Sequence, residues 1–129
     1  MFEECKTRTD QGNIGEIRAI YEFTKLGYVV CKPLTNNNKY DLVVEKNGSM
    51  KRVSVKTSRY SRRGGYGVQL STNGGNTKLN TINRRKCDDF DILFVLTDDD
   101  CCYVIPTDSL GEAECSIVVG ATKYNEFKI

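Results

Sequence analysis

The dipeptide Asn47-Gly48 lies between two short segments in which apolar and polar residues alternate, and no other feature of the sequence constrains the fold as strongly. The segments are 40–45 and 51–57, and alternation with a period of two is typical of a half-buried β-strand. Asn and Gly tolerate the positive φ angles of a two-residue type I′ turn. The sequence therefore predicts a β-hairpin in which Lys46 faces Ser49 and the residue numbers of each later pair sum to 95.

This register places Asp41 opposite Ser54 and predicts which side chains share a face of the hairpin. The apolar face comprises Tyr40, Leu42, Val44, Val53 and Val55. The polar face comprises Asp41, Val43, Glu45, Arg52, Ser54 and Lys56. Lys56 is then diagonal to Asp41 at roughly 7–8 Å, so the two charged groups can converge on one ligand or form an ordinary cross-strand ion pair.

A helix is expected before the hairpin. The residues at 13–16 are typical of a helix start with Asn13 as the N-cap, and Gly27 predicts the end of the helix. Apolar residues follow at helical spacing, namely Ile17, Ile20, Tyr21, Phe23 and Leu26. Glu16 falls on this predicted apolar stripe, where a carboxylate needs a partner. It could alternatively close a capping box with Asn13.

Further strands are predicted at 28–31, 66–70, 91–96 and 102–105, with Thr107 or Asp108 as the cap of a last helical turn. The segment 78–86 is compatible with a short helix or with a DNA-contacting loop. We therefore expect one domain over residues 1–129, with a helix packed on a mixed β-sheet.

The composition excludes several classes of protein. The chain contains no histidine, which excludes a Ser-His-Asp triad, a Cys-His pair and a histidine general base. Six cysteines form no CxxC pair, so we expect reduced thiols and no zinc site. No segment is long and apolar enough for a membrane span or a signal peptide, and the expectation is a soluble protein that is not exported.

Charge is strongly segregated along the chain, although the net charge is only +2. No acidic residue lies between Glu45 and Asp88, and this stretch carries eleven Lys and Arg residues. Tyr, Asn and Gly residues are interleaved with them, as suits a phosphate backbone with base edges nearby. The pattern predicts a nucleic-acid partner, with a solvated basic surface as the alternative.

A helix glutamate, a hairpin aspartate and a residue-x-lysine on the next strand follow one another at Glu16, Asp41 and Ser54-Val55-Lys56. Over residues 13–57 this arrangement resembles the PD-(D/E)XK nuclease superfamily, and within it the homing endonucleases of cyanobacterial group I introns. Two differences stand out, because no proline precedes Asp41 and Ser54 stands where the superfamily has Asp or Glu and the intron nucleases have Gln. The resemblance implies an α/β (α+β) fold with a restriction-endonuclease-like core, a mixed sheet of about four to five strands flanked by helices.

The same resemblance implies Mg²⁺-dependent hydrolysis of phosphodiester bonds in double-stranded DNA. Glu16, Asp41 and the backbone carbonyl of Val55 would hold the cation, which fits the preference of Mg²⁺ for oxygen ligands. Lys56 would orient the attacking water or neutralise charge on the phosphate. Ser54 would contribute weakly, through a water molecule.

The resemblance also implies a symmetric homodimer or homotetramer, because a chain of this length cannot cover a long DNA site alone. We expect it to act in the cytoplasm of a bacterial or phage-infected bacterial cell. A Holliday-junction resolvase or restriction-type nuclease of the same fold, a catalytically decayed DNA-binding module and a plain interaction domain are the alternatives. The expected DNA contacts are Arg59, Arg62, Arg63, Asn73, Asn76, Lys78, Arg84, Arg85 and Lys86.

Overall fold

The computed structural model describes residues 1–36, 38–73 and 82–129, and its centre is a five-stranded sheet in the order β1-β2-β3-β8-β9. β3 and β8 are parallel and the other neighbours are antiparallel, so the predicted mixed sheet is confirmed. The bounds are β1 Val29–Cys31, β2 Leu42–Lys46, β3 Ser49–Ser58, β8 Ile92–Thr97 and β9 Cys102–Pro106.

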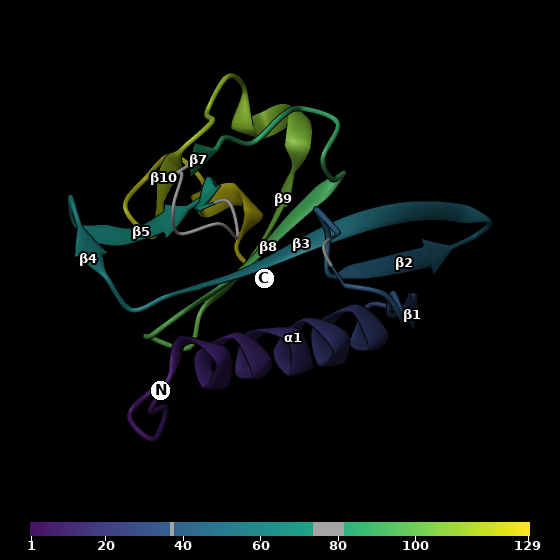
Figure 1. Cartoon of the computed structure of the whole chain (residues 1–129), viewed down its shortest axis with the longest axis horizontal. Helices are drawn as coiled ribbons and strands as arrows, with labels where there is room; N and C mark the ends of the chain where they lie inside the picture. The colour runs from purple at the N-terminus through teal and green to yellow at the C-terminus, as the bar shows by residue number, and fades with distance from the viewer. Residues whose placement is uncertain (37, 74–81) are drawn as a thin grey trace.

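The two faces of the large sheet are covered differently. The helix α1, Arg8–Lys25, lies along one face, and a smaller sheet in the order β10-β5-β4 lies on the other (Figure 1). The resemblance implied flanking helices, and within the described residues α1 covers one face while a sheet covers the other. The remaining elements are β4 Ser61–Arg62, β5 Gly65–Gln69, β6 Thr72–Asn73, β7 Ile82–Asn83, β10 Ser116–Val119 and the 3-10 turns η1 Thr107–Leu110 and η2 Asn125–Phe127.

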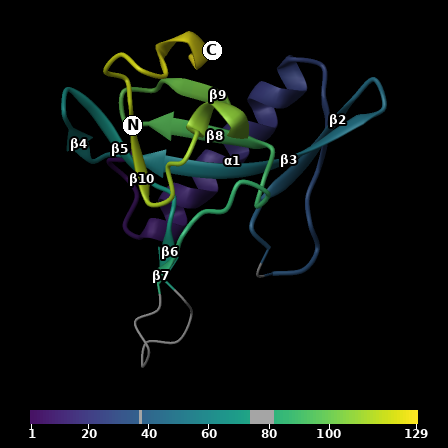
Figure 2. The same ribbon diagram turned by 90° about the horizontal axis from the view of Figure 1, so that it is seen from above.

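Each cover encloses its own hydrophobic core. Under α1, the side chains of Phe23, Leu42 and Phe94 are buried together, and on the opposite face Leu93 and Ile105 pack with side chains of the smaller sheet. Because β8 contributes to both cores, it reads as a nearly continuous apolar segment in the sequence. The pair β6 and β7 extends away from this layered body (Figure 2).

The hairpin has the predicted register, with Lys46 paired to Ser49 and the ladder continuing in step. Asn47 and Gly48 both have positive φ angles, 54° and 80°, as the predicted type I′ turn requires. Tyr40 is an exception to the predicted apolar face, because it packs against the core on the opposite side of the sheet. β2 begins only at residue 42, so strand alternation does not extend to Tyr40.

The predicted start of the helix is wrong. α1 begins at Arg8, and Thr7 is its N-cap. The backbone N–H of Asp10 donates to the Thr7 hydroxyl at 3.0 Å, and the Asp10 carboxylate accepts from the Thr7 N–H at 3.0 Å. This reciprocal capping box satisfies backbone N–H groups of the first helical turn, and its N-cap lies six residues before Asn13. Asn13 therefore lies inside the helix, and Glu16 has no capping role.

The predicted buried stripe of α1 is also largely wrong. The buried residues are Gly15, Ala19, Glu22 and Phe23, whereas Ile17 is 68% exposed. A Cβ atom at Gly15 would overlap the methyl group of Thr57, so the helix approaches the sheet through small residues. Larger apolar residues predicted for this stripe therefore point outward, namely Ile20, Tyr21 and Leu26.

The other predicted elements are confirmed with small changes. The helix ends at Lys25 and Gly27 has a φ of 90°, as the glycine indicated. In η1 neither Thr107 nor Asp108 is the cap, because Pro106 takes that position and the Thr107 hydroxyl donates to the Phe90 carbonyl at 2.8 Å. Of the ambiguous segment, residues 78–81 lie outside the described residues, and β7 follows them. No helix in the described ranges is long and apolar enough to cross a membrane.

Candidate active site

Asp41 lies where the ladder between β2 and β3 ends. Its backbone N–H donates to the carbonyl of Val53 at 2.8 Å. At the next position along β3, the Val55 N–H donates to the Asp41 carboxylate at 2.7 Å. The Asp41 side chain thus takes the place of a backbone carbonyl of the ladder. The carboxylate is therefore held against the edge of β3 by a charge-assisted bond.

The backbone of Val55 presents its carbonyl at the same edge. The carbonyls of Arg52 and Ser58 accept hydrogen bonds on the β8 side, whereas the Val53 carbonyl and the Val55 N–H face Asp41. In a strand the N–H and C=O groups of one residue point to the same neighbour. The Val55 carbonyl is therefore directed toward the side on which the Asp41 carboxylate lies.

Three charges act on the Asp41 carboxylate. Burial raises the pKa of Asp41 above its ordinary value, and the hydrogen bond from Val55 opposes this increase. The positive charge of Lys56 also lowers the pKa, while the negative charge of Glu16 raises it. Lys32 adds a smaller lowering effect. Glu16 of the helix and Lys56 of β3 are thus both within electrostatic range of Asp41.

Glu16 and Asp41 line the same cavity, which has a volume of about 230 Å³. Glu16 comes from the middle of α1, and its carboxylate forms an ion pair with the ammonium of Lys32 at 3.2 Å. The loop between β1 and β2 closes the cavity with polar side chains. The described residues that line it are Glu16, Lys32, Pro33, Thr35, Asn36, Asn38, Tyr40 and Asp41.

The donor set of this cavity fits a magnesium ion. Mg²⁺ prefers oxygen ligands, retains several waters and needs only one or two protein carboxylates. Glu16 and Asp41 supply the carboxylates, and the Val55 carbonyl is directed to the same side. Within the described residues no group of three or more His, Cys, Asp or Glu side chains is placed to hold a metal ion. Soft ligands of the kind that favour zinc are not part of the cavity lining.

Ser54 belongs to the predicted polar face of the hairpin, but this face is not open to solvent at Ser54. Its side chain is only 3% exposed, because the smaller sheet covers this side of β3. It is paired with Leu93 of β8 and does not line the cavity of Glu16 and Asp41. Arg52, on the same predicted polar face, forms an ion pair with Asp91 at 3.2 Å.

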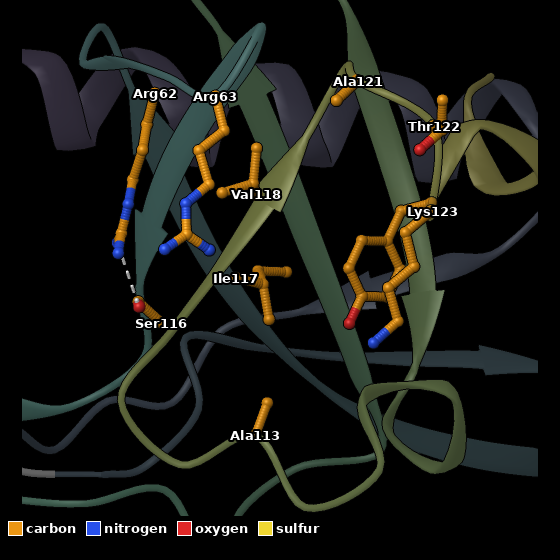
Figure 3. Close-up of a pocket in the computed structure, with 10 residues that line it drawn as sticks. Arg62, Arg63, Ala113, Ser116, Ile117, Val118, Ala121, Thr122 and Lys123 are labelled. Atoms are coloured by element: carbon orange, nitrogen blue, oxygen red, sulfur yellow. Dashed lines mark hydrogen bonds between the residues drawn. The ribbon is translucent and has the colours of Figure 1, made fainter.

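The basic residues predicted to contact DNA are distributed over several surfaces. Arg59 is exposed, and its guanidinium donates to the carbonyl of Phe2 at 3.3 Å. Arg62 and Arg63 lie with Lys123 around a separate cavity of about 330 Å³. Figure 3 shows the two arginines on one side of this cavity and Lys123 on the other. Arg62 also donates to the hydroxyl of Ser116 at 3.3 Å.

Arg85 has a structural position that the sequence did not reveal. It is only 5% exposed, and its guanidinium donates to the carbonyls of Gly111 at 2.8 Å and Ala113 at 2.7 Å. The prediction that Arg85 contacts DNA is therefore wrong, because burial removes it from the surface. Its neighbours Arg84 and Lys86 are exposed, and Arg84 forms an ion pair with Glu114 at 3.4 Å.

Two of the remaining predicted contacts, Asn76 and Lys78, lie outside the described residues, and Asn73 lies in β6. Sequence reasoning missed Lys32, which pairs with Glu16 and lines the cavity. In the sequence, Lys32 directly follows the first predicted strand and precedes Pro33 and an asparagine-rich loop. This position predicts a turn but does not predict an ion pair with Glu16.

A family model, a curated relative and a solved structure are each similar to this chain. A family model described as PD-(D/E)XK endonuclease matches residues 6–128. Protein 5.3 of Escherichia phage T7 is 36% identical over 94 residues, which is 69% of this chain and 72% of the phage protein. The solved structure of a bacterial homing endonuclease, I-Ssp6803I, is similar with a TM-score of 0.78 and 27% identity over 90% of this chain and 80% of that chain.

Proposed function

Because the chain belongs to the PD-(D/E)XK endonuclease family, we propose that it is a site-specific homing endonuclease that hydrolyses double-stranded DNA with Mg²⁺. The fold is the expected restriction-endonuclease-like one, α+β with a mixed five-stranded sheet. Family and structural likeness together support a DNA-cleaving hydrolase. The observation that carries the proposal is the shared cavity of Glu16 and Asp41, with Lys56 close to Asp41.

In this proposal Glu16, Asp41 and the Val55 carbonyl hold one Mg²⁺. When bound, the cation would stabilise negative charge on the phosphate and make water a better nucleophile. The hydrogen bond from the Val55 N–H keeps the Asp41 carboxylate in one orientation, so the ligand is positioned before the cation arrives. The burial that raises the pKa of Asp41 makes a cation the favourable partner for its negative charge.

Lys56 supplies a positive charge within electrostatic range of Asp41. It lies in β3, is half-buried, and acts on Asp41 through its charge. An ammonium in this position would orient the attacking water and oppose the charge that develops on the phosphate. Ser54 would have a minor role through a water molecule, because it is buried and carries no charge.

Binding of a long duplex would rest on basic residues outside the cavity, all of the described ones exposed except the half-buried Arg62. Arg59, Arg62, Arg63, Arg84 and Lys86 are the described candidates, with Asn73 in β6 and with Asn76 and Lys78 beyond the described residues. A symmetric homodimer or homotetramer would bring two active sites to the two strands. The phage relative supports action in a bacterial or phage-infected bacterial cell.

Cleavage of supercoiled plasmid libraries by the purified protein tests this function. We expect nicked and linear products with Mg²⁺ and none with EDTA, because two carboxylates alone cannot neutralise the transition state. DNA binding measured in EDTA serves as the control. Binding without cleavage under any divalent ion would favour a decayed binding module, and preference for four-way junctions over linear duplex would favour a resolvase.

Lys32 should compete with the metal for Glu16. Its ammonium lies 3.2 Å from the Glu16 carboxylate but is 65% exposed, so the pair is weak. We expect Lys32→Ala to tighten cation binding by about two- to five-fold, in line with an exposed ion pair. Terbium luminescence titration in the absence of DNA measures this without any cleavage assay.

The matched control is Lys25→Ala, which removes an exposed lysine from the end of α1 away from the cavity. It should leave the terbium affinity unchanged. Equal affinities for wild type and Lys32→Ala would show that Glu16 does not hold the cation, or that Lys32 does not oppose it.

A further inference from the structure

A second cavity, of about 520 Å³, lies between the N-terminal segment and the end of β3. Three cations line it, Lys6 and Arg8 from the N-terminal segment and Arg59 from the residue that follows β3. Its lining includes no carboxylate. Lys6 and Arg8 are not part of the long basic stretch of the sequence, because they stand among Glu and Asp residues near the N-terminus.

The cations converge with neutral groups that can donate hydrogen bonds. Gln11 and Gln69 contribute amides and Thr57 contributes a hydroxyl, whereas the Ser58 hydroxyl already donates to the Gly67 carbonyl. Two acids lie nearby: Asp10 is engaged in the capping box of α1, and Asp98, which is close to Arg59, accepts from the Met1 ammonium and the Phe2 N–H. Like charges brought to one cavity repel one another, so an anion that joins them is stabilising. Ammonium, guanidinium and amide groups together suit the oxygens of a phosphate.

Two elements, α1 and β3, contribute residues both to this cavity and to the proposed active site. Gln11 donates to the Thr57 hydroxyl at 2.8 Å, and Thr57 directly follows Lys56. Along α1, Gln11 lies five residues before Glu16, an axial rise of about 7.5 Å. Along β3, Arg59 lies three residues after Lys56, about 10 Å away.

We propose that this cavity binds backbone phosphates of the cleaved DNA strand, through Lys6, Arg8 and Arg59, within about three nucleotides of the scissile bond. The inference rests on the proposed function, because the position of the cut is set by Glu16, Asp41 and Lys56. The spacing follows from the rise of about 3.4 Å per phosphate along one strand of a duplex. The N-terminal segment is thereby a substrate-positioning element as well as the start of the helix.

The double variant Lys6→Ala/Arg8→Ala tests the proposal. Both residues are exposed, and neither is a capping residue of α1, so the fold should be retained. DNA affinity is measured by fluorescence anisotropy in EDTA over a range of about 50 to 200 mM salt. We expect roughly tenfold or greater weakening at the lower salt, where phosphate contacts contribute most, and a salt slope that is smaller in magnitude by about two, one for each lost phosphate contact.

The matched control is Lys25→Ala/Lys51→Ala, which removes the same charge from exposed positions at the other ends of α1 and β3. It should keep the wild-type salt slope. Ethylation interference on cleavable DNA should show blocked phosphates next to the cut for wild type, and this interference should disappear for Lys6→Ala/Arg8→Ala. Wild-type slope and interference in that variant would overturn the proposal while leaving the nuclease function intact. Failure of the wild type to bind any DNA would overturn both.

Discussion

Replacement of Asp41 by Asn is expected to lower the rate of Mg²⁺-dependent DNA cleavage by about 10³-fold or more. Asn is nearly the same size, and its carbonyl oxygen can still accept the hydrogen bond from Val55. Only the negative charge is lost, and with it a ligand of the proposed cation. Single-turnover cleavage at saturating protein measures the rate, and DNA affinity in EDTA should change by less than about threefold.

The stability of the same variant provides an independent readout. Burial raises the pKa of Asp41, so the folded protein loses stability as the pH rises from the ordinary Asp pKa through the raised one. Asp41→Asn lacks this loss and should unfold at a higher temperature than wild type near neutral pH, in the absence of metal.

Asp91→Asn is the matched control, because the hydrogen bond with Arg52 lowers the pKa of Asp91. The stabilisation that the Asp91 carboxylate provides is present at neutral pH and is lost as the pH falls through the lowered pKa. The Asp91→Asn variant should therefore unfold at a lower temperature than wild type near neutral pH.

If Asp41→Asn cut DNA at the wild-type rate, the proposed ligand set would be wrong.

Replacement of Lys56 by Met is expected to reduce cleavage by about 10²- to 10³-fold, the effect of removing one positioned electrostatic group. Met keeps most of the side-chain volume but removes the charge beside Asp41. The loss should appear in the single-turnover rate, with little change in DNA affinity, because one phosphate contact contributes little to binding at a long site.

Lys51→Met is the control for this prediction. It lies in the same strand, five residues earlier, and is exposed. The same change of charge and shape there should leave the cleavage rate within about twofold of wild type. A large loss in both variants would indicate a general charge effect, and a wild-type rate in Lys56→Met would exclude a catalytic role for this lysine.

The hairpin was predictable because its causes are local. Asn47 and Gly48 determine the turn, the turn determines the register, and the register places Asp41 beside Val55 and near Lys56. The strand at 91–96 was predictable for a similar reason, since a short apolar run in a small α+β chain is typical of a buried strand. The positions of Asp41, Val55 and Lys56 in the candidate site therefore follow from the sequence of a single hairpin.

The rest depends on contacts between distant segments. The burial of Gly15 against Thr57 cannot be inferred from helical periodicity, which favours large apolar residues for the buried face. Arg85 belongs to a charge run in the sequence, and only the folded chain brings the Gly111 and Ala113 carbonyls to its guanidinium. The pairing of Lys32 with Glu16 likewise joins a loop to a helix.

The close contact between Gly15 and Thr57 has a consequence for the two acids. Glu16 is the next residue after Gly15, and Thr57 belongs to the strand to which Asp41 is anchored through Val55. The backbone of Gly15 therefore packs directly against the Thr57 methyl group, and no side chain of residue 15 holds the helix further from the strand. The separation of the Glu16 and Asp41 carboxylates, which would hold one ion between them, thus depends on the absence of a side chain at Gly15.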